Sequence, residues 1–146
     1  MKHLGIDFGL KRIGLAVTDP AGRMAFPYQT LVRGDNESLF ARLCEIIDQE
    51  GIQGIVLGMP HGLAGQETPA VTQVRNFAAQ LSRRTAVPIH PVDESLTTAE
   101  AEERLREAGV PPSKRKHIVD QQAAVIILES FLQRQSAGCV PGRKEE

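Results

Sequence analysis

The amino-acid sequence predicts an α/β fold in which helices flank a mixed β-sheet. Three strand patterns come first, separated only by short connections, which is typical of an antiparallel meander. Two further apolar runs follow, each after a segment with helical spacing of its apolar residues. Such strand–helix–strand crossovers imply two parallel strands joined by right-handed connections. At 146 residues, the chain is long enough for one domain with its own hydrophobic core.

The antiparallel part is predicted at the N-terminus. Residues 4–9 form an apolar run that contains one acid, Asp7, and residues 13–18 return as a second strand. A weaker third strand is predicted at residues 24–31. Pro27 marks it as an edge strand, because proline has no amide hydrogen to donate to a neighbouring strand.

The parallel part is predicted to alternate helices and strands. Apolar residues recur at helical spacing from Asp35 or Asn36 to Glu50, and Gly51 follows as a helix end. A buried strand is predicted next at 54–58, followed by a helix from Thr68 onward and a strand at 87–92. The Thr97/Glu100 capping box then begins another helix, and a basic loop leads into the last helix at 118–135. Residues 136–146 are predicted to be a disordered tail, so the single domain spans residues 1–135.

Composition excludes several classes of protein. The net charge is −1, which gives no support to a protein that coats nucleic acid. No apolar run of 18 residues is present, and Asp7, Lys11 and Arg12 interrupt any signal-peptide core at the N-terminus. The two cysteines are no disulfide framework. We therefore expect a cytoplasmic protein with free thiols.

Three acids are predicted to converge. Asp7 lies inside the first strand, where a buried charge needs a partner. Glu94 follows the strand at 87–92, at a carboxyl end of the kind where α/β sheets bind ligands. Asp120 shares the apolar face of the last helix with Ala124, Ile127 and Phe131. Each acid alone also fits a structural role, as a turn acid, a surface residue and a helix N-terminal acid, respectively.

Convergence would give these carboxylates a metal-binding role. Three carboxylates in one place repel, unless one is protonated or a cation compensates. Mg²⁺ takes oxygen ligands, including one or two carboxylates and substrate phosphates. Two such ions, about 3.5–4 Å apart, can activate water and stabilise the leaving oxygen in phosphodiester cleavage. The cofactor expected here is therefore Mg²⁺ or Mn²⁺, as a pair of ions.

Three ordered motifs resemble those of one known family. The segment from Gly5 to Val17, GIDFGLKRIGLAV, looks like the opening motif of the YqgF family of Holliday-junction-resolvase-like proteins, which are also described as pre-16S rRNA nucleases. Asp93-Glu94-Ser95-Leu96-Thr97-Thr98 and Asp120-Gln121-Gln122-Ala123-Ala124 match its second and third motifs, and Gly58-Met59-Pro60 opens its loop motif. The resemblance runs from about Leu4 to Leu132.

This resemblance implies a ribonuclease-H-like fold and metal-dependent cleavage of structured nucleic acid. Processing of the 5′ end of pre-16S rRNA is the implied role, and Asp7, Glu94 and Asp120 match the proposed metal-binding catalytic acids. Two positions depart from the family pattern. Ser95 stands where an arginine is usual, which removes a bidentate phosphate ligand, and Ala64 stands where an acid is usual.

Basic residues near these motifs are candidate contacts to nucleic acid. Lys11 and Arg12 follow Asp7 in the same hairpin, and a basic run precedes Asp120 on the way into the last helix: Lys114, Arg115, Lys116 and His117. Each could equally belong to a solvated face. The partner is expected to be nucleic acid, with precursor rRNA favoured over branched DNA and no membrane. The sequence leaves a monomer and a homodimer both open.

Other functions remain as alternatives. A branched-DNA resolvase would use the same acids. A non-catalytic nucleic-acid-binding protein of the same fold is favoured by Ser95 and Ala64, although the three acids are retained. An actin-like or sugar-kinase-like ATPase also opens with an acid and glycines on its first hairpin, but it needs a second domain for which 146 residues leave no room.

Overall fold

The computed structural model describes residues 1–60, 68–93 and 97–138, with the side chains of these residues except for 97–99, 113–117 and 136–138. Nine elements follow one another along this part of the chain: β1 (His3–Phe8), β2 (Arg12–Thr18), β3 (Ala25–Val32), α1 (Asn36–Glu50), β4 (Gly54–Met59), α2 (Pro69–Ser82), β5 (Ile89–Asp93), α3 (Thr97–Glu107) and α4 (Pro112–Gly138). This order of strands and helices is the predicted one.

The strands form one mixed sheet in the order β3-β2-β1-β4-β5. β1 pairs antiparallel with β2, and β2 with β3, whereas β1 and β4, and β4 and β5, run parallel. The predicted meander and the predicted parallel strands are therefore both confirmed. β3, which contains Pro27, is an edge strand as expected.

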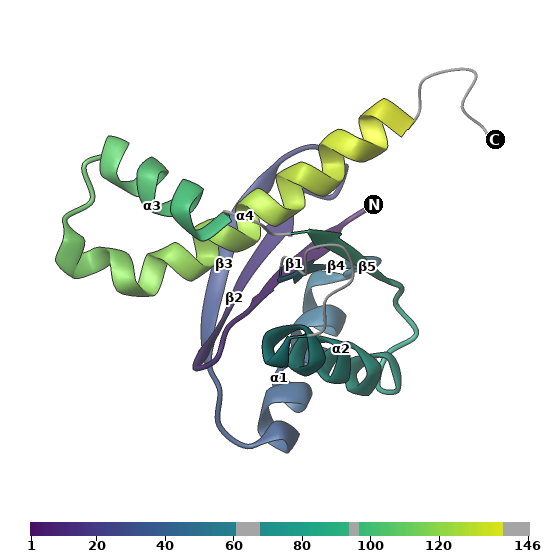
Figure 1. Ribbon diagram of the computed structural model, residues 1–146. Coiled ribbons are helices and arrows are strands. Elements are labelled where there is room, and N and C mark those ends of the chain that lie inside the picture. Colours follow the sequence, from purple (N-terminus) through teal and green to yellow (C-terminus); the bar gives the residue numbers. More distant parts are fainter. Residues whose placement is uncertain (61–67, 94–96, 139–146) are drawn as a thin grey trace.

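Helices cover both faces of this sheet (Figure 1). α1 and α2 lie on one face, and α4 crosses the other, with α3 lying against α4. Strand alternation separates the two faces. In β1, Leu4 and Ile6 pack with the buried residues of α1 and α2, whereas Gly5 faces the backbone and side chains of α4. Asp7, two residues after Gly5, lies on this second face.

The predicted helix starts are present. The Asp35 side chain accepts a hydrogen bond from the backbone N–H of Ser38, and Thr68 does the same for Val71. These caps satisfy backbone donors that have no partner within the helix. Gly51 ends α1 with a left-handed backbone, φ 65°, which glycine adopts without strain. None of the described helices is long and apolar enough to cross a membrane.

The last helix differs from its prediction. α4 begins at Pro112, six residues before the predicted start at Ile118, and it extends to Gly138 rather than to Gln135. The predicted basic loop at 114–117 is therefore helical. Proline suits the first turn of a helix, where its missing N–H costs no hydrogen bond, so Pro112 begins this helix rather than keeping the chain in a loop. Residues 139–146 of the predicted tail lie outside the described part.

A buried histidine lies beneath the C-terminal half of α4. His3 is 3% exposed, and its ring lies 5.0 Å from the Phe131 ring and 6.2 Å from the His90 ring, centroid to centroid. Gly54 leaves room for it, because a Cβ there would lie 2.6 Å from the imidazole. Burial lowers the pKa of His3 most, the nearby His90 and N-terminus lower it further, and a hydrogen bond with the Met1 backbone opposes them.

We expect His3 to make the protein less stable in mild acid. Its pKa is below 6.5 in the folded chain, so as pH falls below about 6.5 the unfolded chain binds the proton first. The free energy of unfolding then falls, by at most about 1.4 kcal/mol per pH unit for one proton. Urea unfolding of wild type and His3→Phe from pH 5 to pH 8 measures this. The difference in free energy of unfolding between the wild type and His3→Phe should be constant above pH 7.5. Below pH 6.5, the wild type should lose stability relative to the variant. A difference that stays constant from pH 5 to pH 8 would show that the pKa of His3 is not lowered in the folded protein.

Candidate active site

Asp7 is held at the carboxyl end of the central strand. It is the second-last residue of β1, it lies directly opposite Gly14 of β2, and it is 9% exposed. Residues opposite each other in an antiparallel pair point to the same face, so Asp7 and the open face of Gly14 both lie under α4. A short polar side chain therefore sits at an otherwise apolar position of the sheet.

Gly14 brings Asp120 to the same place. A Cβ on Gly14 would lie 2.0 Å from the Asp120 carbonyl oxygen and 2.8 Å from its Cβ, so the helix backbone rests directly on the strand. Gly5 allows a similar approach one turn further along α4, where its Cβ would lie 2.9 Å from the Ala124 carbonyl oxygen. The predicted inward face of α4 is confirmed, since Ala124 and Ile127 are completely buried. Two of the three predicted acids are thus brought to neighbouring positions.

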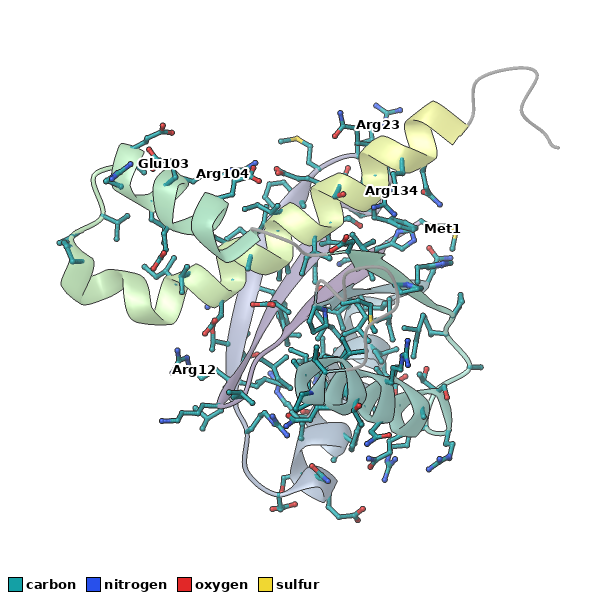
Figure 2. All side chains as sticks on the ribbon, in the orientation of Figure 1. Met1, Arg12, Arg23, Glu103, Arg104 and Arg134 are labelled. Carbon is teal, nitrogen blue, oxygen red and sulfur yellow. The ribbon has the colours of Figure 1, made fainter. Side chains whose placement is uncertain are left out.

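Arg12 is the charge partner of Asp120. Its Nε donates to Asp120 Oδ2 at 2.8 Å, and the two side chains are 27% and 18% exposed. Arg12 lies two residues before Gly14 and thus on the same face of β2; Figure 2 shows it beside the β1–β2 turn. The sequence suggested Arg12 only as a phosphate contact. In the structure, it neutralises one of the proposed acids, and so it reduces the repulsion between carboxylates.

A second polar pair involves Gln121, the residue after Asp120. The Gln121 amide donates to the Thr30 hydroxyl at 3.0 Å, and Thr30 is the β3 residue opposite Gly14. This hydrogen bond ties the same turn of α4 to the edge of the sheet. Sequence analysis missed Gly14 and Gln121 as positioning residues. The sequence did contain a signal for each of them. Gln121 is adjacent to Asp120, and Gly14 lies within a strand, where a glycine often marks the close approach of another backbone.

The strand that precedes Glu94 ends at the same edge of the sheet. Ile6 is paired with Leu57, and Leu57 with Pro91, so Asp93 lies level with Phe8, the residue after Asp7. Glu94 itself lies outside the described residues, as do the two departures from the family pattern, Ser95 and Ala64. The side chains of Lys114, Arg115, Lys116 and His117 also lie outside them, although their backbone belongs to α4. Lys11 is exposed at the β1–β2 turn.

The donor chemistry of this site fits a hard divalent cation. Asp7 and Asp120 offer carboxylate oxygens, the ligands that Mg²⁺ and Mn²⁺ prefer. Asp120 already pairs with one cation, the Arg12 guanidinium, through Oδ2. Among the described residues, no group of three His, Cys, Asp or Glu side chains is arranged to hold a metal ion. Two carboxylates suffice for magnesium when water and substrate phosphates complete its shell.

Sequence comparison gives close relatives. A family model described as "RuvX: Holliday junction resolvase" matches residues 1–134. A protein of Oleidesulfovibrio alaskensis is 51% identical over 132 residues, which cover 90% of this chain and 92% of that one. A protein of Maridesulfovibrio salexigens is also 51% identical, over 134 residues that cover 92% and 99% of the two chains. Both relatives carry the name "Putative pre-16S rRNA nuclease".

Solved structures show the same fold at low sequence identity. The chain is similar to Thermus thermophilus RuvC in complex with a Holliday junction substrate, with a TM-score of 0.59, 17% identity, and 93% and 96% of the two chains covered. The fowlpox virus resolvase, bound to Holliday junction DNA, gives a TM-score of 0.56 at 9% identity, covering 92% and 99% of the chains. The predicted ribonuclease-H-like fold is thereby confirmed.

Gly14→Ala should lower the stability of the fold. The new methyl group would overlap the Asp120 carbonyl oxygen, and because that oxygen belongs to a helix backbone, it cannot move aside cheaply. Overpacking of this kind costs about 1–3 kcal/mol. Gly34→Ala is the matched control, since a Cβ there meets no atom within 4 Å. Chemical unfolding measures both variants. Equal midpoints for the two variants would show that α4 does not rest on the strand backbone.

The Arg12–Asp120 ion pair should contribute measurably to the metal-free fold. A charged hydrogen bond that is partly shielded from water is worth about 1–2 kcal/mol, between a fully exposed and a buried pair. The measurement is a double-mutant cycle of Arg12→Ala, Asp120→Asn and both, unfolded in EDTA. A coupling energy near 1–2 kcal/mol is expected. Additive effects, within about 0.3 kcal/mol, would mean that the two side chains do not interact in solution.

Proposed function

Because the chain belongs to the RuvX family, also called YqgF, we propose that it is a metal-dependent nuclease that hydrolyses phosphodiester bonds in structured nucleic acid. The proposed substrate is precursor 16S rRNA, cleaved in the processing of its 5′ end in the cytoplasm. The names of relatives at 51% identity support this substrate. The observation that carries the chemistry is the placement of Asp7 and Asp120 around Gly14 at the carboxyl end of β1.

Asp7, Asp120 and Glu94 are the proposed metal ligands. Divalent ions, when bound, supply an activated water and stabilise the leaving oxygen. Asp7 and Asp120 would hold them through carboxylate oxygens and fix them at the edge of the sheet. Since Glu94 follows Asp93 at the end of β5, it is proposed as the third acid from the chain order and the family motif. Mg²⁺ or Mn²⁺ is proposed, as a pair of ions.

Basic side chains are proposed to hold the phosphates on either side of the cleaved bond. Arg12 forms the ion pair with Asp120 described above, so its guanidinium already lies at the site. Lys11 follows the same turn. The run Lys114, Arg115, Lys116 and His117 precedes Asp120 by three to six positions on α4, which places its backbone within two helical turns of the site. Each phosphate contact adds salt-dependent affinity without reading sequence.

Branched DNA is the second candidate substrate. The description of the matching family model, a Holliday junction resolvase, favours it. The same acids and the same metal chemistry would serve, because attack of a metal-activated water on the phosphate requires no 2′-hydroxyl. A panel of precursor rRNA fragments, single-stranded RNA and four-way DNA junctions, each with Mg²⁺ or Mn²⁺, separates the two substrates.

Neutralising any of the three acids should abolish cleavage while the protein stays folded. Each carboxylate is proposed as a direct metal ligand, so Asp7→Asn, Glu94→Gln and Asp120→Asn should each lose more in rate than the roughly 10–100-fold that removal of an outer-shell partner of a metal costs. Asp48→Asn, on the exposed face of α1, is the matched control and should cleave like the wild type. The measurement is cleavage of the best substrate of the panel.

Thermal melts of the same variants give a second result. Metal should stabilise the wild type by about 2.7 kcal/mol at a hundredfold excess over the dissociation constant, and it should stabilise Asp7→Asn far less. Wild-type activity in any one acid variant would remove that residue from the site. Equal metal stabilisation of wild type and Asp7→Asn would instead place the metal elsewhere.

A further inference from the structure

A cavity lies on the opposite face of the sheet from Asp120. Its volume is about 180 Å³, it opens to solvent on one side, and it is lined by residues of α1, α2 and the end of β1 together with Arg33, the residue after β3. Phe8 lines it. Because successive residues of a strand point to opposite faces, Phe8 points toward α2 while Asp7 points toward α4. The cavity and the proposed catalytic acid are therefore next to each other along β1 but lie on opposite faces of the sheet, at the carboxyl end of that strand.

Flat groups form the inner side of this cavity. The Phe8 and Phe77 rings are 4.5 Å apart, and Phe77 stacks on Phe40 at 5.5 Å, centroid to centroid. Arg33 lies over the Phe8 ring, with its Cζ 4.4 Å from the ring centroid. The guanidinium is fixed there by hydrogen bonds from Nη1 to the carbonyl oxygens of Gly9 and Leu10, at 3.1 and 3.0 Å. A fixed guanidinium plane is a surface on which a flat ring can stack.

Carboxamides form the rim. In the part of the chain that the structure describes, four of them line the cavity, one from α1 and three from α2: Asn36, Gln73, Asn76 and Gln80. Each carboxamide both donates and accepts hydrogen bonds. Among the described residues that line it there is no acid, and Arg33 is the single charged side chain. This chemistry suits a neutral, flat group with donors and acceptors along its edge, attached to a phosphate.

The size of the cavity selects one such group. An apolar cavity of about 150 Å³ can hold a single benzene ring, whereas pockets for larger ligands measure about 300–1,000 Å³. At about 180 Å³, this cavity suits one ring system. A base in a duplex is stacked and paired, so its edge cannot enter. An unpaired base can.

We infer that this cavity receives one unpaired base of the nucleic acid substrate, close to the phosphate that is cleaved at Asp7. The inference rests on the proposed function and adds a substrate preference to it. The backbone of the substrate would pass around the β1–β2 turn, where Leu10 and Lys11 are exposed. Substrates with a single-stranded segment beside the cleavage site are then bound in preference to uninterrupted duplexes.

Abasic scanning tests this inference by binding alone. A duplex RNA with a single-stranded extension is titrated in EDTA, with each extension nucleotide made abasic in turn. The wild type should lose about tenfold in affinity at one position, since a stacked base contributes about 1–3 kcal/mol. The double variant Gln73→Met/Gln80→Met keeps the side-chain shape and the stacking surface of Phe8 and Arg33 but removes two amides that would bond the edge of the base, so that loss should shrink from about tenfold to about threefold. Gln49→Met, an exposed amide on α1, should keep the tenfold loss.

Two outcomes would overturn the inference. The first is the same abasic profile in all three proteins, because the cavity would then not contact a base. The second is competition by free nucleoside monophosphates at the concentration at which the extended RNA binds, because the cavity would then be a site for free nucleotides. Both readouts measure binding without metal. Failure of the proposed nuclease activity would leave them unchanged, so the two proposals fail separately.

Discussion

The contact between the α4 backbone and the sheet at Gly14 determines the geometry of the rest of the site. A helix normally stands off a sheet by the thickness of the side chains between them. Here, glycines at positions 5 and 14 remove those side chains, and the Asp120 carbonyl rests on β2. Asp7, which pairs with Gly14 across the strands, is thereby covered by the helix turn that carries Asp120. Small residues at two sheet positions thus bring together acids that are 113 positions apart in the chain.

This close packing creates an electrostatic cost that Arg12 offsets. Carboxylates held near one another and partly shielded from water repel, and a cation beside them restores balance. The 2.8 Å ion pair between Arg12 and Asp120 supplies that cation from within the fold. The proposed active site, which collects negative charge, therefore also gives a reason for a positive residue at the start of β2, two positions from Gly14. The same charge is available to a phosphate.

β1 ends with two residues that serve opposite faces of the sheet. Asp7 points into the space under α4, where the proposed hydrolysis takes place, and Phe8 points into the cavity between α1 and α2. Arg33 links the two faces, because it stacks on Phe8 and holds the turn that leads to Arg12. Because successive side chains of β1 point to opposite faces of the sheet, the proposed hydrolysis at Asp7 and the proposed base site at Phe8 lie on different faces. A substrate that uses both must bend around the hairpin turn.

The order of elements, the mixed sheet and the helix caps at Asp35 and Thr68 were all predictable from the sequence, because strand alternation, helical spacing and capping are local patterns. The inward position of Asp120 followed from the same periodicity. The start of α4 was missed because a proline and a basic run resemble a loop when only local preference is considered, and the helix gains its stability from packing on the sheet and α3. The ion partner of Asp120, the role of Gly14 and the aromatic cavity were decided only by the tertiary structure. Each depends on residues that are distant in the chain, and no local pattern records which of them meet.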